Sequence, residues 1–176
     1  MKWLKYGVAG LLGLIALFLV TMFVLGKRSG AGRIQTATEI NRPPEEVWKW
    51  LEEPEHFKQW VSYVSEVRDE GPKGVGGKRA TFMKDPNMGG EAVRVDSIVR
   101  EEVRHSKIAI DLSSPMGFTG HMVYTLEDLG GRTRLLTDST FQYEHWFAAL
   151  MEPLVTPQAR KKMEDDLATL KRLAEK

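Results

Sequence analysis

The sequence predicts an α+β fold, in which a curved seven-stranded antiparallel sheet carries two short helices and one long C-terminal helix, behind a single N-terminal transmembrane helix. Three observations predict this fold. Residues 6–26 contain no charged side chain. Residues 64–143 alternate apolar and polar residues in short segments separated by Gly and Pro turns, which is typical of antiparallel strands. Residues 146–176 show the apolar spacing of one long helix.

The uncharged run is long enough to cross a membrane. As a helix its 21 residues span about 30 Å, the thickness of the hydrocarbon core. Trp3 and Tyr6 lie where interfacial aromatic anchors are expected. A cleaved signal peptide is the alternative, but its apolar region covers about 7–15 residues and ends in small residues. Residues 22–25 are bulky instead, so we expect an uncleaved anchor.

The charges on the two sides of this run are nearly balanced. Two basic residues precede it and three follow it: Lys2, Lys5, Lys27, Arg28 and Arg33. Because short N-terminal tails often stay inside, we expect the soluble domain on the extracytoplasmic side. The predicted organisation is a transmembrane anchor at 1–28, a flexible linker at 29–32 and a folded domain at 33–176.

The composition excludes several classes of protein. The 176-residue chain contains no cysteine, which excludes a disulfide framework, a zinc ribbon and a cysteine nucleophile. Four of the 25 basic residues and none of the 24 acidic residues lie in 1–28, so residues 29–176 carry a net charge of −3. A mildly acidic domain of mixed charge offers no electrostatic reason to bind nucleic acid, and we expect no such partner.

Prolines mark the first elements of the domain. Residues 33–40 alternate and are rich in β-branched residues, which predicts a strand. Pro44 suits the first position of a helix, and the two glutamates after it favour the positive end of the helix dipole. Pro54 ends this helix and begins a second short one that runs to Trp60. Six further strands are predicted, at 64–71, 76–83, 89–99, 104–114, 118–128 and 132–143.

The C-terminal helix is predicted to cover the sheet. Its apolar stripe follows helical spacing: Met163, Leu167, Leu170 and Ala174. Pro153 and Pro157 predict a kink or break in its first half. A sheet with one apolar face must bury that face. One helix gripped by a curled sheet leaves space between the two, so we expect an apolar cavity there.

The segment EINRPPEEVWKWLEEPEHFKQW, residues 39–60, resembles the opening of the START-like, Bet v 1-like (SRPBCC) superfamily, within its polyketide cyclase/dehydrase and lipid-transport group. The segments VGGK (75–78), GGRTRL (130–135) and DDLATLKRLAE (165–175) are similar to that group as well. The resemblance covers residues 33–175 and implies a helix-grip fold with a ligand cavity. One such fold hosts transport proteins, enzymes and co-chaperones, so it does not decide the function.

No motif of catalytic or metal chemistry is present in the sequence. The four histidines do not have metal-ligand spacing: His56, His105, His121 and His145. There is no G-x-S-x-G, and GVGGK lacks the spacing of a phosphate-binding loop. The carboxylates at 164–166 point in different directions on a helix, which indicates a solvated face. We expect no metal and no cofactor.

The expected function is membrane-anchored binding of a hydrophobic small molecule or lipid. The expected ligand-binding residues line the cavity: Ile110, Met122, Tyr124, Ser139, Phe141, Trp146, Leu150 and Leu154. The polar residues assigned to the inward faces are all neutral, which argues against general acid–base catalysis.

Two alternatives remain open. A polyketide cyclase or dehydratase would need an inward acid–base pair, for which the candidates are Arg94, His121 and Asp138. A co-chaperone-like interaction module would instead have a filled cavity and an exposed apolar patch. The sequence does not indicate an oligomeric state.

Overall fold

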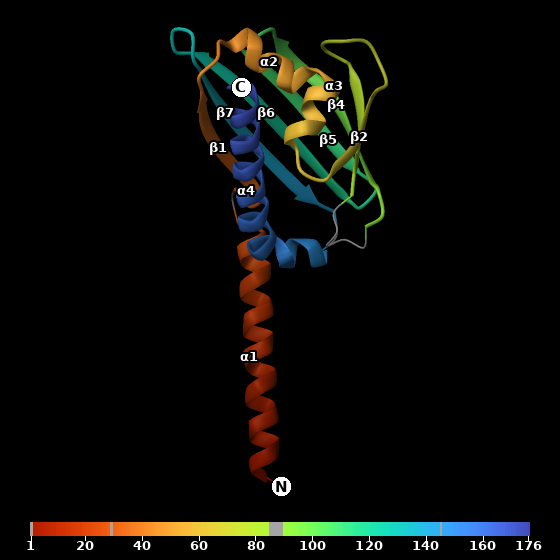
Figure 1. The fold of residues 1–176 in the computed structure, drawn as a ribbon. Coiled ribbons are helices and arrows are strands. Elements are labelled where there is room, and N and C mark those ends of the chain that lie inside the picture. The colour runs from red at the N-terminus through yellow and green to blue at the C-terminus, as the bar shows by residue number, and fades with distance from the viewer. Residues whose placement is uncertain (1, 29, 85–89, 145) are drawn as a thin grey trace.

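The structure is a computed structural model that describes residues 2–28, 30–84, 90–144 and 146–176. Ser29, Gly89 and His145, which enter the sequence predictions above, lie outside the described residues. Figure 1 shows one long helix extending from a compact domain. In chain order the elements are α1 (Lys2–Gly26), β1 (Arg33–Ile40), α2 (Pro44–Glu52), α3 (Pro54–Trp60), β2 (Val64–Asp69), β3 (Lys78–Met83), β4 (Val93–Val103), β5 (Lys107–Ser114), β6 (Phe118–Asp128), β7 (Thr133–Tyr143) and α4 (Trp146–Ala174).

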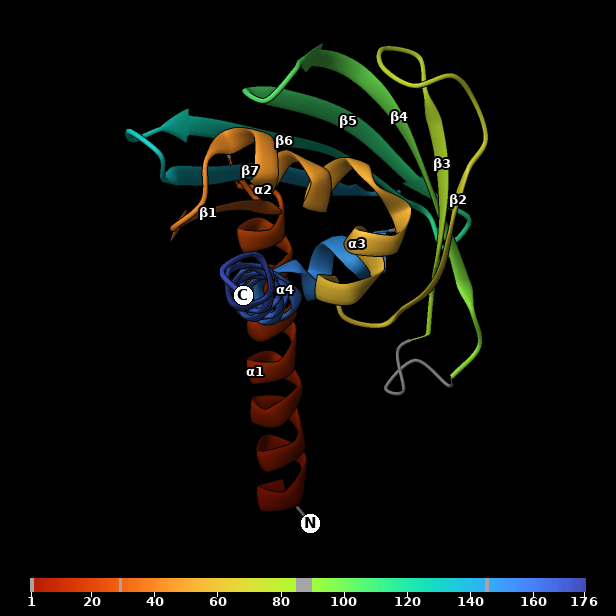
Figure 2. The ribbon, with the colours of Figure 1, turned by 45° about the horizontal axis from the view of Figure 1, so that its top comes forward.

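The predicted sheet is confirmed in strand number, direction and curvature. The seven strands lie in the order β1-β7-β6-β5-β4-β3-β2, and every neighbouring pair is antiparallel. The chain runs as a meander from β2 to β7, and β1 closes the far edge against β7. Figure 2 shows the sheet curling around α4, which lies in its concave face with α2 and α3 beside it.

Several predicted strand boundaries differ from the structure, and the largest shift is in β4. The sequence predicted strands at 89–99 and 104–114, but β4 runs from Val93 to Val103 and β5 begins at Lys107, so the turn covers residues 104–106. His105 at its centre adopts a left-handed backbone conformation with φ of 62°. Its ring packs edge-on against Trp48 of α2, 6.0 Å between centroids, which ties this turn to the helix layer.

The two proline-initiated helices each pack one tryptophan into the core. Pro44 and Pro54 occupy the first turns of α2 and α3. Trp48 and Trp60 are buried, and the indole N–H of Trp60 donates to the carbonyl of Trp50 at 2.8 Å. Leu167 and Leu170 of α4 meet them from the other side, so the core lies between the sheet, α2–α3 and the C-terminal half of α4.

The long helix α4 is bent at the predicted prolines. Pro153 and Pro157 both lie inside it. Figure 1 shows its N-terminal turns, in light blue, running across the axis of the rest of the helix. A proline removes one helical hydrogen bond and crowds the preceding turn, which accounts for the change of direction.

The prediction of a fully solvated carboxylate cluster on α4 was wrong for Asp166. This side chain is buried and accepts a hydrogen bond from the backbone N–H of Ser62 at 3.0 Å. Lys162 donates to its other oxygen at 2.8 Å. Asp166 therefore fastens the end of α3 to α4, a role that helical spacing alone did not indicate.

Candidate functional site

The candidate site is a small cavity between the concave face of the sheet, the helices α2 and α3, and the loop of residues 70–77. Its volume is about 120 Å³. Most of its wall is apolar, and the side chains of that wall are Leu51, Phe57, Val99, Ile108, Ile110 and Leu112. A concave, mostly apolar hollow with a few polar groups is the usual form of a small-molecule site.

Strand register explains why these side chains converge. Val99 of β4 is paired with Ile110 of β5, and Ile110 is paired with Met122 of β6. Directly paired residues point to the same face of a sheet, and every second residue along a strand shares that face. Ile108 and Leu112 therefore point inward together with Ile110, as the alternation of this strand predicts.

Tyr124 is the one tyrosine among the described residues that line the cavity. Burial raises the pKa of this phenol well above its ordinary value, and the carboxylate of Asp166 adds to the rise. The phenol therefore stays protonated around neutral pH. In that state it can donate a hydrogen bond to a ligand, but it cannot act as a general base.

A charged pair also lines the cavity, so the prediction of exclusively neutral inward residues was wrong. The guanidinium of Arg79 donates to Asp69 at 2.7 Å and to the backbone carbonyls of Leu51 and Glu52. These carbonyls end α2, where the helix dipole favours a cation. Arg79 also lies over the ring of Phe57, 5.6 Å from its centroid. Strand alternation places Arg79 and Asp69 on one face of the sheet, but only the position of α2 makes them cavity residues.

The eight predicted ligand-binding residues are distributed over three environments. Ile110 and Tyr124 line the cavity. Four others lie elsewhere in or beside the core: Met122, Ser139, Phe141 and Leu150. Trp146 and Leu154 lie at the surface, 70% and 49% exposed, and so not in the cavity wall. The bend of α4 carries these two side chains away from the sheet.

The three residues that a catalytic role would require point away from the cavity. Arg94, His121 and Asp138 occupy the sheet face opposite α4, where each forms an ion pair. His121 Nδ1 lies 2.8 Å from Asp111, and Asp138 binds Arg33. Hydrogen bonds from Arg33 and Gln35 lower the pKa of Asp138. The geometry thus gives the cyclase alternative no acid–base pair at the cavity from these three residues.

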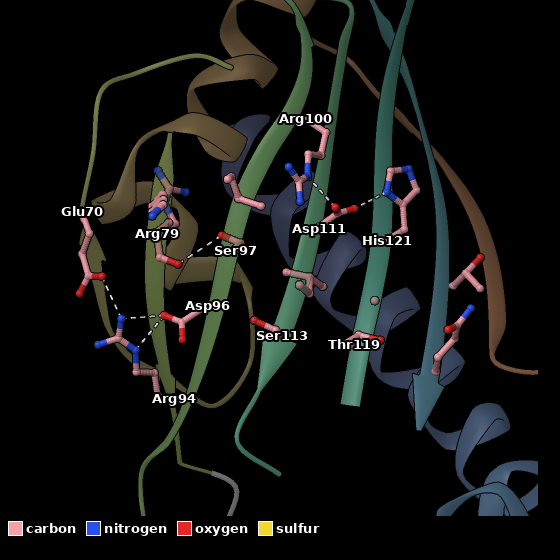
Figure 3. Close-up of a pocket in the computed structure, with 16 residues that line it drawn as sticks. Glu70, Arg79, Arg94, Asp96, Ser97, Arg100, Asp111, Ser113, Thr119 and His121 are labelled. Atoms are coloured by element: carbon pink, nitrogen blue, oxygen red, sulfur yellow. Dashed lines mark hydrogen bonds and ion pairs between the residues drawn. The ribbon is translucent and has the colours of Figure 1, made fainter. Parts of the chain in front are cut away.

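The same outer face carries a larger, open groove of about 700 Å³. Figure 3 shows Asp111 between Arg100 and His121, and a second ion-pair group in which Arg94 meets Glu70 and Asp96. Hydrogen bonds from His121 and Arg100 lower the pKa of Asp111. Because these charges are exposed and mutually paired, they present little net field to a ligand. We therefore favour the smaller inner cavity as the functional site.

A curved antiparallel sheet that grips one long helix over an apolar cavity defines the helix-grip, Bet v 1-like class of proteins. Solved structures confirm the class. The protein TTHA0849 from Thermus thermophilus matches at a TM-score of 0.66 and 18% identity, over 81% of this chain and 96% of that one. The protein CV1439 from Chromobacterium violaceum matches at a TM-score of 0.65 and 15% identity, over 82% of this chain and 98% of that one. Ara h 8.0201 matches at a TM-score of 0.65 and 13% identity, over 81% of this chain and 96% of that one.

The chain belongs to the family described as polyketide cyclase / dehydrase and lipid transport, whose profile matches residues 31–175. No functionally curated protein matches the chain. The structural similarities are below 25% identity and therefore establish the fold alone, whereas the family match also indicates hydrophobic ligand binding as the general function.

Proposed function

We propose that the protein binds a hydrophobic small molecule or lipid in the inner cavity while α1 anchors it to a membrane. The observation that carries this proposal is the apolar wall formed by Ile108, Ile110 and Leu112, with the protonated Tyr124 beside it. This combination suits an apolar ligand that carries one hydrogen-bond acceptor. Tyr124 and Ile110 are the proposed ligand contacts.

The size of the cavity limits the ligand or requires the cavity to widen. Its 120 Å³ is smaller than the pockets of about 300–1,000 Å³ that hold drug-sized ligands. A lipid would therefore have to displace part of the wall, and widening on ligand binding forms part of the proposal. A smaller apolar molecule would enter with less rearrangement.

The anchor follows from the exposure of α1. Tyr6–Gly26 is long and apolar enough to cross a membrane, and side chains such as Leu14, Leu17 and Phe18 are exposed along it. The ion pair between Arg28 and the buried Glu152 favours an α1 that is retained and not cleaved. An anchor at 1–28 and a domain at 33–176, on the extracytoplasmic side, complete the proposal. Tethering raises the effective concentration of the cavity near lipid-borne ligands.

Native mass spectrometry of the full chain, followed by extraction and identification of retained small molecules, tests ligand binding. Val99→Trp places a large ring in the cavity, and Ile98→Trp places the same ring on the opposite sheet face one residue away. We expect the wild type and Ile98→Trp to retain an apolar ligand and Val99→Trp to lose it. A chain that carries no ligand in any form, or equal retention by both variants, would exclude this cavity as the site.

A further inference from the structure

Exposed apolar side chains gather where α1 meets the domain. Trp146 and Phe147 begin α4, and their rings form an edge-on pair with centroids 6.0 Å apart. They are 70% and 57% exposed, and Leu154 and Val155 are exposed about two turns further along the helix. Met116 is exposed in the turn between β5 and β6. We call these five residues the apolar patch.

The turn that carries Met116 lies beside the start of α4. Phe118 at the start of β6 is paired with Tyr143 at the end of β7, three residues before Trp146. The N–H of Glu144 donates to the carbonyl of Gly117 at 3.0 Å, which fixes the turn to the β7–α4 connection. Sequence-distant apolar side chains are thereby brought to one end of the domain.

The apolar patch contrasts with the rest of α4. Further along the helix Leu167 and Leu170 are buried against the sheet and α2–α3. Among the described residues, Trp146 and Phe147 are not buried in this way, although burying two adjacent aromatic side chains would be strongly favourable. Exposed large apolar side chains that gather at one end of a domain mark an interaction surface.

The packing of α1 sets the depth of the apolar patch relative to a bilayer. α1 packs against α4, and Met22 is buried at 8% exposure while Phe23 and Leu25 beside it are exposed. Met22 lies four residues before Gly26, where the apolar run ends, which corresponds to about 6 Å along the helix. The part of α4 that touches α1 thus lies at the boundary between acyl chains and headgroups if α1 spans the bilayer.

Hydrogen bonds to Glu152 fix the direction of the first turns of α4. The carboxylate of Glu152 is only 2% exposed. It accepts hydrogen bonds from Arg28 Nη1 at 2.9 Å, the Gly32 N–H at 2.8 Å and Thr156 Oγ1 at 2.9 Å. The exit of α1 and the first turns of α4 are therefore held together. Figure 1 shows these turns running across the axis of α1, which is the direction of a membrane surface.

We propose that the apolar patch inserts into the headgroup–acyl boundary of the same bilayer that α1 spans, so that the domain rests on the membrane in one orientation. This inference rests on the proposed anchoring by α1. Tryptophan at the interface and an apolar helix face in the membrane plane are established forms of such contact. In this orientation the loop of residues 70–77, at the cavity rim, points away from the bilayer (Figure 1).

Single cysteines test the proposal cleanly because the chain has no native cysteine. The full chain is reconstituted into vesicles of phosphatidylcholine and phosphatidylglycerol and labelled with bimane at Phe147→Cys or Leu154→Cys. Val103→Cys is the matched control, an equally exposed apolar position at the opposite end of the sheet. A lipid with a nitroxide near its headgroup should quench both patch labels at least about twofold more than the control, as expected for a helix seated about 5–10 Å deep.

A label at Leu17→Cys, exposed in the middle of α1, separates the two proposals. Quenching at Leu17 by lipid with a deeply placed nitroxide, together with control-level quenching at Phe147 and Leu154, would overturn the patch and leave the anchor intact. No quenching at Leu17 would overturn the anchor and the patch together. Patch labels that self-quench between chains but ignore the lipid nitroxide would assign the patch to a second copy and overturn the proposal.

Discussion

The carboxylate of Glu152 joins α1 to the domain, and its replacement perturbs that junction specifically. Glu152→Gln keeps the side-chain volume and one acceptor oxygen but removes the charge. Arg28 then loses its ionic partner. The N–H of Gly32 and the hydroxyl of Thr156 must share the amide oxygen, which is a weaker acceptor than the carboxylate. Glu152→Ala removes all three hydrogen bonds and leaves a buried N–H unpaired.

The magnitudes follow from burial. A hydrogen bond to a charged group contributes about 1.5–3 kcal/mol when buried, but the side chain of Arg28 is 46% exposed, so water replaces much of its loss. We expect Glu152→Gln to lower the free energy of unfolding by about 1–2 kcal/mol and Glu152→Ala by about 2–4 kcal/mol. For a chain of this size the glutamine variant should lose about 2–8 °C in Tm.

Thermal unfolding of the full chain in detergent micelles measures this loss through the fluorescence of the buried Trp48 and Trp60. Glu164→Gln is the matched control, since Glu164 is an exposed glutamate of the same helix. Arg28→Gln should cost less than Glu152→Gln, because Arg28 can be rehydrated. If Glu152→Gln melts within about 1 °C of the control, the inferred role of the buried carboxylate is refuted.

Three further predictions concern the cavity, the outer face and the core. Because the pKa of Tyr124 is raised in the folded state, its contribution to stability is present below about pH 10 and declines above it, and Tyr124→Phe should flatten that alkaline decline in urea titrations. Because the pKa of Asp111 is lowered, its contribution is present above about pH 4 and is lost as the pH falls further, so Asp111→Asn should weaken the acid dependence of stability. Leu170→Ala should cost about 2–5 kcal/mol of unfolding free energy, against a much smaller cost for the exposed Leu129→Ala.

Each of these has an outcome that contradicts it. An alkaline decline unchanged in Tyr124→Phe would show that another group causes it. If stability depends on acid pH in the same way for wild type and Asp111→Asn, the ion pairs of Asp111 do not contribute to stability. Equal denaturation midpoints for the two leucine variants would contradict the position of the core.

The order and class of the elements could be predicted because local rules act strongly in this chain. Pro44 and Pro54 can begin a helix but cannot continue a strand, and alternation along β5 leaves Ile108, Ile110 and Leu112 on one face whatever surrounds them. The turn at His105 was missed because a non-glycine residue with positive φ carries no clear sequence signal.

The candidate site was predicted only in part. Ile110 and Tyr124 follow from strand alternation, but Arg79 and Asp69 became cavity residues through the position of α2, whose terminal carbonyls hold the guanidinium. That position depends on packing between elements far apart in the sequence.

By itself, the sequence determined the strand and helix order, the long apolar N-terminal helix and the inward face of the central strands, because proline geometry and the two-residue period of a strand are local properties. Only the tertiary structure decided the small volume of the cavity, the burial of Glu152 and Asp166, and the exposure of Trp146 and Leu154. These depend on the direction in which α4 leaves its bend and on where it meets α1. Helical periodicity repeats along one axis and cannot specify a change of axis.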